Sequence, residues 1–364
     1  MSQHIREDIN QLPAYQPIPD PAAVARELGL PEMAKLDTNE TPYGPLPGVL
    51  DAAVLSLEYV HRYPDLTPVK LISTLASHYG LDPAGIAVGN GSAGLIESLV
   101  MGTTRTGDEV VYSWRSFEAY PLIASVAGAR AVPVPRSPGY GHDLPAILDA
   151  ITSRTRLIIL CNPSNPTGTY LPPQQVEDFL GQVPDHVLVV LDEAYHEFIS
   201  PRPETDTLAT AALRKNVVVL RSFSKAWGLA GLRVGWLYGM PELTQAVRKC
   251  ILPFSVNSLA QAAAVAALRE EREMLRRAAE TARERDRTAA ALRTLTPGIP
   301  LSQGNFLWAP LGEKTAAFTE EAKRQGILVR GFPGEGARIT IGTIAQNDFL
   351  IDRYPTILDR AQRN

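Results

Sequence analysis

Lys225 is the residue of this chain whose surroundings most favour covalent chemistry. It comes shortly after the apolar run 217–220 and lies between Phe223 and Trp227, among otherwise small and apolar side chains. Removing water from a lysine lowers the pKa of its amine, and the neutral amine is a nucleophile able to form a Schiff base. Most lysines are solvated surface residues, but one that follows a buried strand is placed differently. We therefore interpret Lys225 as a candidate nucleophile.

Asp192 ends the most apolar run of the chain, residues 187–191. An unpaired carboxylate at such a position is costly, so the sequence predicts a compensating partner for it. For an aspartate considered alone, the expected partner is a nearby arginine or lysine in a buried ion pair. Together with a nucleophilic lysine, the same carboxylate can instead serve a ligand.

Two segments are suited to hold a phosphate group. Residues 89–94, Gly-Asn-Gly-Ser-Ala-Gly, follow a short apolar run and precede a helical stretch, which matches the dinucleotide-binding pattern G-x-G-x-x-G. Free backbone N–H groups at the start of a helix bind any phosphate, although a plain tight turn explains this motif equally well. In the second segment, Ser222 and Ser224 offer hydroxyl groups and Arg233 offers a permanent positive charge.

A turn rich in asparagine and proline, residues 161–168, follows the apolar run 157–160. Its two Asn-Pro steps are typical of a rigid turn, and its asparagine side chains can also donate hydrogen bonds to a ligand. The runs at 157–160, 187–191 and 217–220 all end in polar residues. Ligands of open α/β sheets bind at the carboxyl ends of the strands. We therefore expect these three strand ends to border one crevice.

A nucleophilic lysine, a buried carboxylate and phosphate-binding groups are together what pyridoxal phosphate requires of a protein. The lysine binds the aldehyde, the carboxylate keeps the ring nitrogen protonated, and amide, hydroxyl and guanidinium groups hold the phosphate. The sequence therefore predicts pyridoxal 5'-phosphate as the cofactor.

The pattern of apolar runs predicts an α/β fold. From residue 86 to 238, short β-branched runs alternate with longer mixed segments, as strands and crossover helices do in a mostly parallel sheet. Asp20-Pro21 predicts the start of a helix. Residues 259–295 read as one long helix, and we expect its charged tract, 269–287, to be a solvated face.

A smaller α+β domain is expected after this helix, from the strand-like segments 305–309, 327–330 and 337–341. The predicted organisation is a large cofactor-binding domain at residues 41–247. An N-terminal arm and the small domain make up residues 1–40 and 248–364.

The composition excludes several classes of protein. The chain has 364 residues, of which 45% are hydrophobic and 20% charged, and a formal net charge of −4. These values argue against nucleic acid or an anionic membrane as the main partner. The two cysteines, Cys161 and Cys250, are too far apart for a cysteine-rich zinc site, so no metal is expected. Without an apolar run that fits a signal or a membrane span, we expect a cytoplasmic protein that binds small molecules.

These motifs resemble those of the fold-type I pyridoxal-phosphate aminotransferases, specifically the histidinol-phosphate aminotransferase family. The resemblance runs over nearly the whole chain, from residues 12–15, Leu-Pro-Ala-Tyr, and 39–45, Asn-Glu-Thr-Pro-Tyr-Gly-Pro, to 338–342, Arg-Ile-Thr-Ile-Gly. Residues 114–118, Trp-Arg-Ser-Phe-Glu, are more similar to the aromatic amino acid (phenylalanine) aminotransferase branch. The resemblance implies that family's fold, a mostly parallel central sheet with a smaller α+β domain.

The resemblance also implies roles for individual residues. Lys225, Asp192 and Tyr195 would be catalytic, with Lys225 on the cofactor aldehyde and Asp192 on the pyridine nitrogen. Asn165 and Tyr195 would hydrogen-bond the ring oxygen, and Phe117 would stack on the ring. The phosphate would be held by the amides of Ser92 and Ala93, the hydroxyls of Ser222 and Ser224, the guanidinium of Arg233, and Tyr63 from a partner subunit.

On the substrate side, the resemblance implies that Arg338 binds a carboxylate, with Arg330, Tyr15 and Asn165 nearby. A tyrosine lent by the partner implies a homodimer with shared active sites. The activity implied is ping-pong transfer of an amino group between an aromatic L-amino acid and 2-oxoglutarate.

Four alternatives remain open at this point. The nearest is a histidinol-phosphate aminotransferase, because both substrate groups need an aromatic pocket and an anion site. A decarboxylase or lyase can use the same cofactor core. A dehydrogenase built on the glycine motif leaves Lys225 and Asp192 without a role, and a DNA-binding regulator needs a further domain.

Overall fold

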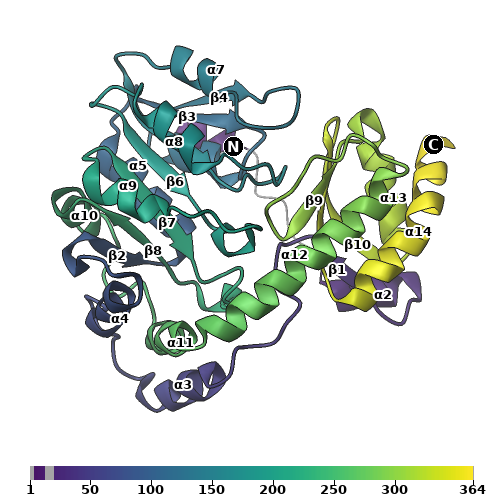
Figure 1. Ribbon diagram of the computed structural model, residues 1–364, viewed down its shortest axis with the longest axis horizontal. Coiled ribbons are helices and arrows are strands. Elements are labelled where there is room, and N and C mark those ends of the chain that lie inside the picture. The colour runs from purple at the N-terminus through teal and green to yellow at the C-terminus, as the bar shows by residue number, and fades with distance from the viewer. Residues whose placement is uncertain (1–3, 13–19, 364) are drawn as a thin grey trace.

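Two β-sheets organise the residues that the computed structural model describes, 4–12 and 20–363. Figure 1 shows the larger sheet with its helices on the left and the smaller sheet on the right, with the long helix α12 (Glu271–Arg293) running between them. The site residues predicted from the sequence are distributed over both parts.

The larger sheet has seven strands in the order β2-β8-β7-β6-β5-β3-β4. β8 runs opposite to the other six strands of this sheet, which are parallel to one another. The mostly parallel sheet predicted from the sequence is therefore confirmed. Its strands are β2 (Ile86–Gly89), β3 (Glu109–Trp114), β4 (Arg130–Pro135), β5 (Thr155–Cys161), β6 (Leu188–Asp192), β7 (Val217–Ser222) and β8 (Gly235–Gly239).

The central strands are apolar at successive positions because helices cover both faces of this sheet. Val189 and Leu191 pack into a core on one face, and Val190 packs into the core on the other. Strands buried on both sides have this continuous apolar pattern. One face is covered by α5 (Gly91–Thr103), α6 (Ala119–Val126) and α10 (Pro241–Arg248), and the other chiefly by α4 (Val69–Tyr79), α8 (Pro173–Leu180), α9 (Thr207–Leu213) and α11 (Ser258–Leu268).

The strand before the glycine motif lies at the edge of the sheet. β2 ends at Gly89 and α5 begins at Gly91, as the motif predicts. However, β2 pairs antiparallel with β8, whereas a dinucleotide-binding unit begins with a strand that pairs in parallel. The topology therefore argues against the dehydrogenase alternative.

The smaller sheet has the order β1-β10-β11-β9 and combines both ends of the chain. β1 (Ala34–Leu36) pairs in parallel with β10 (Ile327–Phe332), which is antiparallel to β11 (Gly336–Thr340), and this strand pairs with β9 (Phe306–Ala309). α13 (Thr315–Arg324) and α14 (Ile344–Arg363) pack on it and share its core. The expected strands at 305–309, 327–330 and 337–341 are all present.

The helix predicted at Asp20-Pro21 is α2 (Pro21–Leu28). The Asp20 carboxylate accepts hydrogen bonds from the amides of Ala22 and Ala23, and Gly29 ends the helix in the left-handed conformation. Before it lies the short α1 (Glu7–Asn10), and before α4 lies α3 (Val49–Ser56); α7 (Leu144–Asp149) follows β4. Of the helices in the described residues, none is long and apolar enough to cross a bilayer.

The single long helix expected at 259–295 is wrong, because the chain forms two helices there. α11 ends at Leu268 and α12 begins at Glu271. The alanine-rich α11 packs against α3 and α4, whereas α12 extends from the core of the larger sheet to that of the smaller one. Tertiary packing thus breaks the helix, since neither glycine nor proline stands at the break. The division of domains at residues 41 and 247 remains a prediction, and α11 packs with the larger sheet.

The charged tract of α12 is not solvated throughout. Arg285 is buried, and its Nη1 donates hydrogen bonds to the backbone oxygens of Phe198, at 3.1 Å, and Gly304, at 3.3 Å. A buried arginine must have such partners, so this side chain ties the two parts of the molecule together.

Candidate active site

A cavity of about 560 Å³ lies where the two sheets face each other, and a smaller one of about 120 Å³ adjoins it. The carboxyl ends of β5, β6 and β7 border the smaller cavity, as the three apolar runs predict. Twelve of the predicted site residues line the two cavities: Ser92, Ala93, Phe117, Asn165, Asp192, Tyr195, Ser222, Ser224, Lys225, Arg233, Arg330 and Arg338.

Two predicted residues are not among them. Tyr63 is 82% exposed outside the cavity, and its ring stacks on Phe254 with 4.6 Å between centroids. Tyr15 lies outside the described residues. The single chain therefore does not bring either tyrosine to the site.

Lys225 borders both cavities from the loop that follows β7. Its Nζ donates a hydrogen bond to the backbone oxygen of Thr38, at 3.4 Å, and lies 5.6 Å from the centroid of the Tyr195 ring. Burial, together with the positive charges of Arg338 and Arg233, lowers the pKa of Lys225 to about 8. A substantial fraction of the amine is therefore neutral near pH 7 to 8, as a nucleophile or a general base requires.

Asp192 is the last residue of β6 and is 4% exposed. Burial raises the pKa of its carboxyl, and two hydrogen bonds oppose this shift. The Tyr120 hydroxyl donates to Oδ2 at 2.5 Å, and the Ala194 amide donates to Oδ1 at 3.3 Å. No lysine or arginine of the described residues forms an ion pair with Asp192, so the ion pair expected for it is wrong. A hydroxyl and an amide stabilise the carboxylate instead.

Sequence reasoning missed Tyr120, whose side chain is fully buried. Its signal was available, because it stands three residues after Phe117 and the two rings meet edge to face at 5.5 Å. Phe117 precedes α6, and the Tyr120 amide donates a hydrogen bond to the Phe117 backbone oxygen at 3.0 Å, so the turn at the start of the helix brings the two side chains together.

An anion-binding corner is formed by the start of α5 and the loop after β7. Arg233 Nη1 donates to Ser224 Oγ at 3.2 Å, and the Ser224 amide donates to Ser222 Oγ at 3.0 Å. Ser92 and Ala93 are in the first turn of α5, whose N-cap residue makes no side-chain capping bond. Amides at a helix start favour an anion, and the guanidinium and hydroxyls beside them add to that preference.

Gly91 is required for this corner. It has a φ of +74°, and a Cβ built on it would lie 2.6 Å from Arg233 Nη2. A side chain there would push the guanidinium away from the helix start. The glycine motif thus serves a close approach of arginine and helix.

Arg338 and Arg330 stand directly opposite each other on the antiparallel strands β11 and β10. Arg338 Nη1 donates to Asn165 Oδ1 at 2.8 Å, and Nη2 donates to the backbone oxygen of Asp37 at 2.7 Å. Arg330 Nη2 donates to Glu118 Oε2 at 2.8 Å. Two positive charges on opposite positions of neighbouring strands repel each other. The oxygen atoms that each arginine contacts offset this repulsion.

Asn39 is a second residue that sequence reasoning did not assign to the site. Its Nδ2 donates to the Tyr195 hydroxyl at 3.0 Å, and its Oδ1 accepts a hydrogen bond from Thr340 at 2.9 Å. It is buried with a φ of +55°. The Asn-Glu-Thr-Pro motif was the signal, although its pattern alone does not show which residue Asn39 contacts.

The comparisons with known proteins agree with this geometry. The family model of aminotransferase class I and II matches residues 31–353. An aromatic amino acid aminotransferase of Streptomyces coelicolor is 46% identical over 96% of both chains, and one of Mycolicibacterium paratuberculosis is 46% identical over the whole of both. A crystal structure of a histidinol-phosphate aminotransferase from Sinorhizobium meliloti with pyridoxal-5'-phosphate has a TM-score of 0.89 at 29% identity, over 99% of this chain and 98% of that one.

We expect Tyr120→Phe to lower the free energy of unfolding by about 1.5–3 kcal/mol at neutral pH, the range for a hydrogen bond to a charged group. The loss should shrink as the pH falls through the raised pKa of Asp192, because protonation removes the charge that the hydroxyl stabilises. Urea unfolding at several pH values measures both effects. Tyr112→Phe is the matched control, since the Tyr112 ring packs on Tyr120 at 6.0 Å. A penalty for Tyr120→Phe that does not change with pH would contradict the assignment.

Proposed function

The chain belongs to the class I and II aminotransferases, and from this premise we propose that it is a pyridoxal-phosphate-dependent aminotransferase acting on aromatic L-amino acids and 2-oxoglutarate. The observation that carries the proposal is one continuous site. It combines the Lys225 amine, with its lowered pKa, the buried Asp192 carboxylate and the anion-binding corner at Arg233. The relatives that are 46% identical over the full length support the aromatic substrate.

The residues present fit pyridoxal phosphate group by group. Lys225 would bind the aldehyde, and Asp192 would accept a hydrogen bond from the ring nitrogen. Asn165 and Tyr195 would donate hydrogen bonds to the ring oxygen. Phe117 lines both cavities and offers its ring to the cofactor ring. The phosphate matches the corner formed by the amides of Ser92 and Ala93, the hydroxyls of Ser222 and Ser224, and the guanidinium of Arg233.

The bound cofactor supplies an electron sink that makes the substrate Cα proton acidic. The chain's own residues then control that proton. Lys225 takes it from Cα and returns it at the cofactor carbon, acting as base and then as acid. Asp192, whose carboxylate accepts hydrogen bonds from Tyr120 and Ala194, would keep a proton on the ring nitrogen.

The substrate carboxylate is the anion that suits Arg338. The planar fork of a guanidinium binds a carboxylate with two parallel hydrogen bonds. Phe117, Val329 and Phe332 line the same cavity and provide apolar surface for a ring. Because both half-reactions use one site, the amino donor and then 2-oxoglutarate would bind Arg338 through a carboxylate.

The homodimer is part of the proposal, and an apolar surface supports it. Large apolar side chains are exposed on α3 and on the segment after it: Leu50, Val54, Leu55, Leu57, Tyr59, Val60, Tyr63 and Leu66. Exposed apolar patches of this extent mark protein interfaces. Tyr63 belongs to this surface, which supports the role at the partner's phosphate that the resemblance implies for it. The cytoplasm stays our prediction for where the enzyme acts.

A panel of amino donors with 2-oxoglutarate tests the substrate class. We expect phenylalanine, tyrosine or tryptophan to give a kcat/KM at least about tenfold above that of aspartate and histidinol phosphate, a difference of about 1.4 kcal/mol. The ring gains apolar contacts that aspartate lacks. A clear preference for histidinol phosphate would replace the substrate assignment, and lack of transfer from every donor would contradict the aminotransferase itself.

Borohydride reduction of the cofactor-loaded protein tests the lysine. We expect the cofactor to become fixed to the peptide that contains Lys225, and Lys225→Ala to lose at least about 10²-fold in turnover, since a positioned proton donor and acceptor contributes that much. Peptide mass spectrometry locates the label. Lys215→Ala, which changes an exposed lysine, is the control and should keep both label and turnover. Label on any other lysine would contradict the assignment of Lys225 as the lysine that binds the cofactor.

Mixing two inactive variants tests the shared site. A Lys225→Ala protein and a Tyr63→Ala protein, combined under conditions that exchange subunits, should recover activity, because one of the two mixed sites regains both residues. Activity after mixing is compared with each variant alone, and light scattering measures the mass. An active monomer rules the shared site out.

A further inference from the structure

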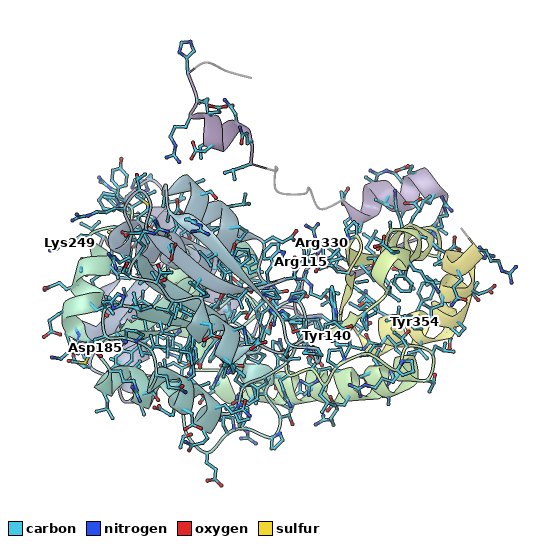
Figure 2. The ribbon with its side chains drawn as sticks, turned by 90° about the horizontal axis from the view of Figure 1, so that it is seen from above. Arg115, Tyr140, Asp185, Lys249, Arg330 and Tyr354 are labelled. Atoms are coloured by element: carbon cyan, nitrogen blue, oxygen red, sulfur yellow. The ribbon has the colours of Figure 1, made fainter. Side chains whose placement is uncertain are left out.

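The Glu118–Arg330 ion pair joins the two halves of the larger cavity. Glu118 is the N-cap residue of α6 on the larger sheet, and Arg330 belongs to β10 of the smaller one. Both side chains line the cavity and remain partly exposed to it, at 27% and 18%. Arg330 thus presents a paired charge to whatever occupies the cavity, and Figure 2 shows it between the two halves, beside Arg115.

The two arginines that the smaller sheet contributes to the cavity have different partners. Arg338 is held by Asn165 and by the backbone oxygen of Asp37. Arg330 faces the carboxylate of Glu118, which is 27% exposed, so another carboxylate can take its place on the guanidinium while Glu118 turns to water. Since Arg330 and Arg338 are directly opposite on neighbouring strands, a ligand with two carboxylates can contact both.

The proposed reaction places two unlike side chains in this cavity. An aromatic ring is neutral, and beside it the charge of Arg330 must be balanced by the protein, because an unpaired charge against apolar groups is costly. The second carboxylate of 2-oxoglutarate instead needs that charge to be available. One arginine with an exchangeable partner satisfies both demands.

We propose that Glu118 is a specificity-determining residue, which pairs with Arg330 when the cavity holds an aromatic side chain and yields it to the distal carboxylate of a dicarboxylic substrate. This inference rests on the proposed aminotransferase function. Glu118 acts through Arg330 and takes no part in the proton transfer at Lys225. Its removal should therefore change which ligand binds, with little effect on the chemical step.

The neighbouring Arg115–Glu335 pair provides a matched control. It also joins the two parts of the molecule, with Arg115 Nε donating to Glu335 Oε1 at 2.9 Å. Its guanidinium is fixed between two rings, 4.5 Å from the centroid of Trp114 and 5.1 Å from that of Phe332. Neither member lines the cavity. Loss of this pair removes a contact between the two parts and leaves the charge in the cavity unchanged.

Calorimetric titration of the cofactor-loaded protein with two unreactive analogues tests the proposal. Glutarate carries two carboxylates, and 3-phenylpropionate carries one carboxylate and a ring. We expect Glu118→Gln to shift the ratio of their dissociation constants at least about tenfold in favour of glutarate, and Arg330→Met to shift it in favour of 3-phenylpropionate. In steady state, Glu118→Gln should raise KM for phenylalanine far more than it changes kcat.

Three further variants keep the test decisive. In the Arg330→Met background, Glu118→Gln should produce no further shift, because the residue acts through Arg330. Glu118→Asp keeps the charge and should retain the wild-type preference, and Glu335→Gln should leave the ratio within about twofold. A shift for Glu118→Gln no larger than that for Glu335→Gln overturns the inference, as does a shift that persists without Arg330.

The outcomes separate this inference from the function on which it rests. If wild-type protein binds both analogues and transfers amino groups, an unchanged ratio in Glu118→Gln contradicts only the role of Glu118. If wild-type protein binds neither analogue and transfers no amino group, the proposed function itself fails.

Discussion

A carboxylate at the end of a fully buried strand is the constraint on which the rest of this site depends. Asp192 cannot stay ionised there without donors, and α6 supplies one through the Tyr120 hydroxyl. The register of the sheet sets Asp192 beside Cys161 of β5 and Leu220 of β7, so the segments that follow these strands open around it. The segment after β5 carries Asn165, β7 itself ends at Ser222, and the segment after β7 carries Ser224 and Lys225. The register of the sheet thus gathers the side chains to which the proposed function assigns the cofactor.

The smaller sheet adds two arginines to the positive charges that Lys225 and Arg233 bring to the site from the larger sheet. β11 and β10 carry Arg338 and Arg330, and the segment after β1 carries Asn39, which donates to Tyr195 of the larger sheet. These polar contacts cross between the two parts, and Arg285 in α12 adds further bonds of the same kind. Because such bonds depend on geometry, the cavity keeps its shape only while both sheets hold their relative position.

Much of the fold was predictable from the sequence because its signals are local. Continuous apolar runs predicted β5, β6 and β7, and Asp20-Pro21 predicted α2. The break between α11 and α12 has no such signal, because neither glycine nor proline stands there, and the two helices differ in what they pack against. Tertiary contacts therefore decide it. The burial of Arg285 was equally unpredictable from local sequence, because the alternating charges along α12 do not show which arginine faces the protein interior.

The site residues also separate into those that local sequence predicted and those that it did not. Residues that follow strand ends were found from the pattern, and the resemblance added their roles, which remain predictions. For Asp192 considered alone the sequence suggested an ion pair, whereas the carboxylate accepts a hydrogen bond from a tyrosine that is 72 positions away in sequence. Cross-strand and cross-sheet partners depend on register, as with Arg330 opposite Arg338. Such pairings cannot be derived from spacing along one chain segment.

The charges of the site also link substrate binding to the reactivity of Lys225. Arg338 and Arg233 both lower the pKa of its amine, by repelling the proton that would make it cationic. Under the proposed function, each of these arginines is neutralised by an anion, a substrate carboxylate on the first and a phosphate on the second. Neutralisation weakens that repulsion and raises the pKa of Lys225. Substrate and phosphate binding would thus hold more of this amine in its protonated form, so that the anions of the site and the proton on Lys225 are coupled through charge alone.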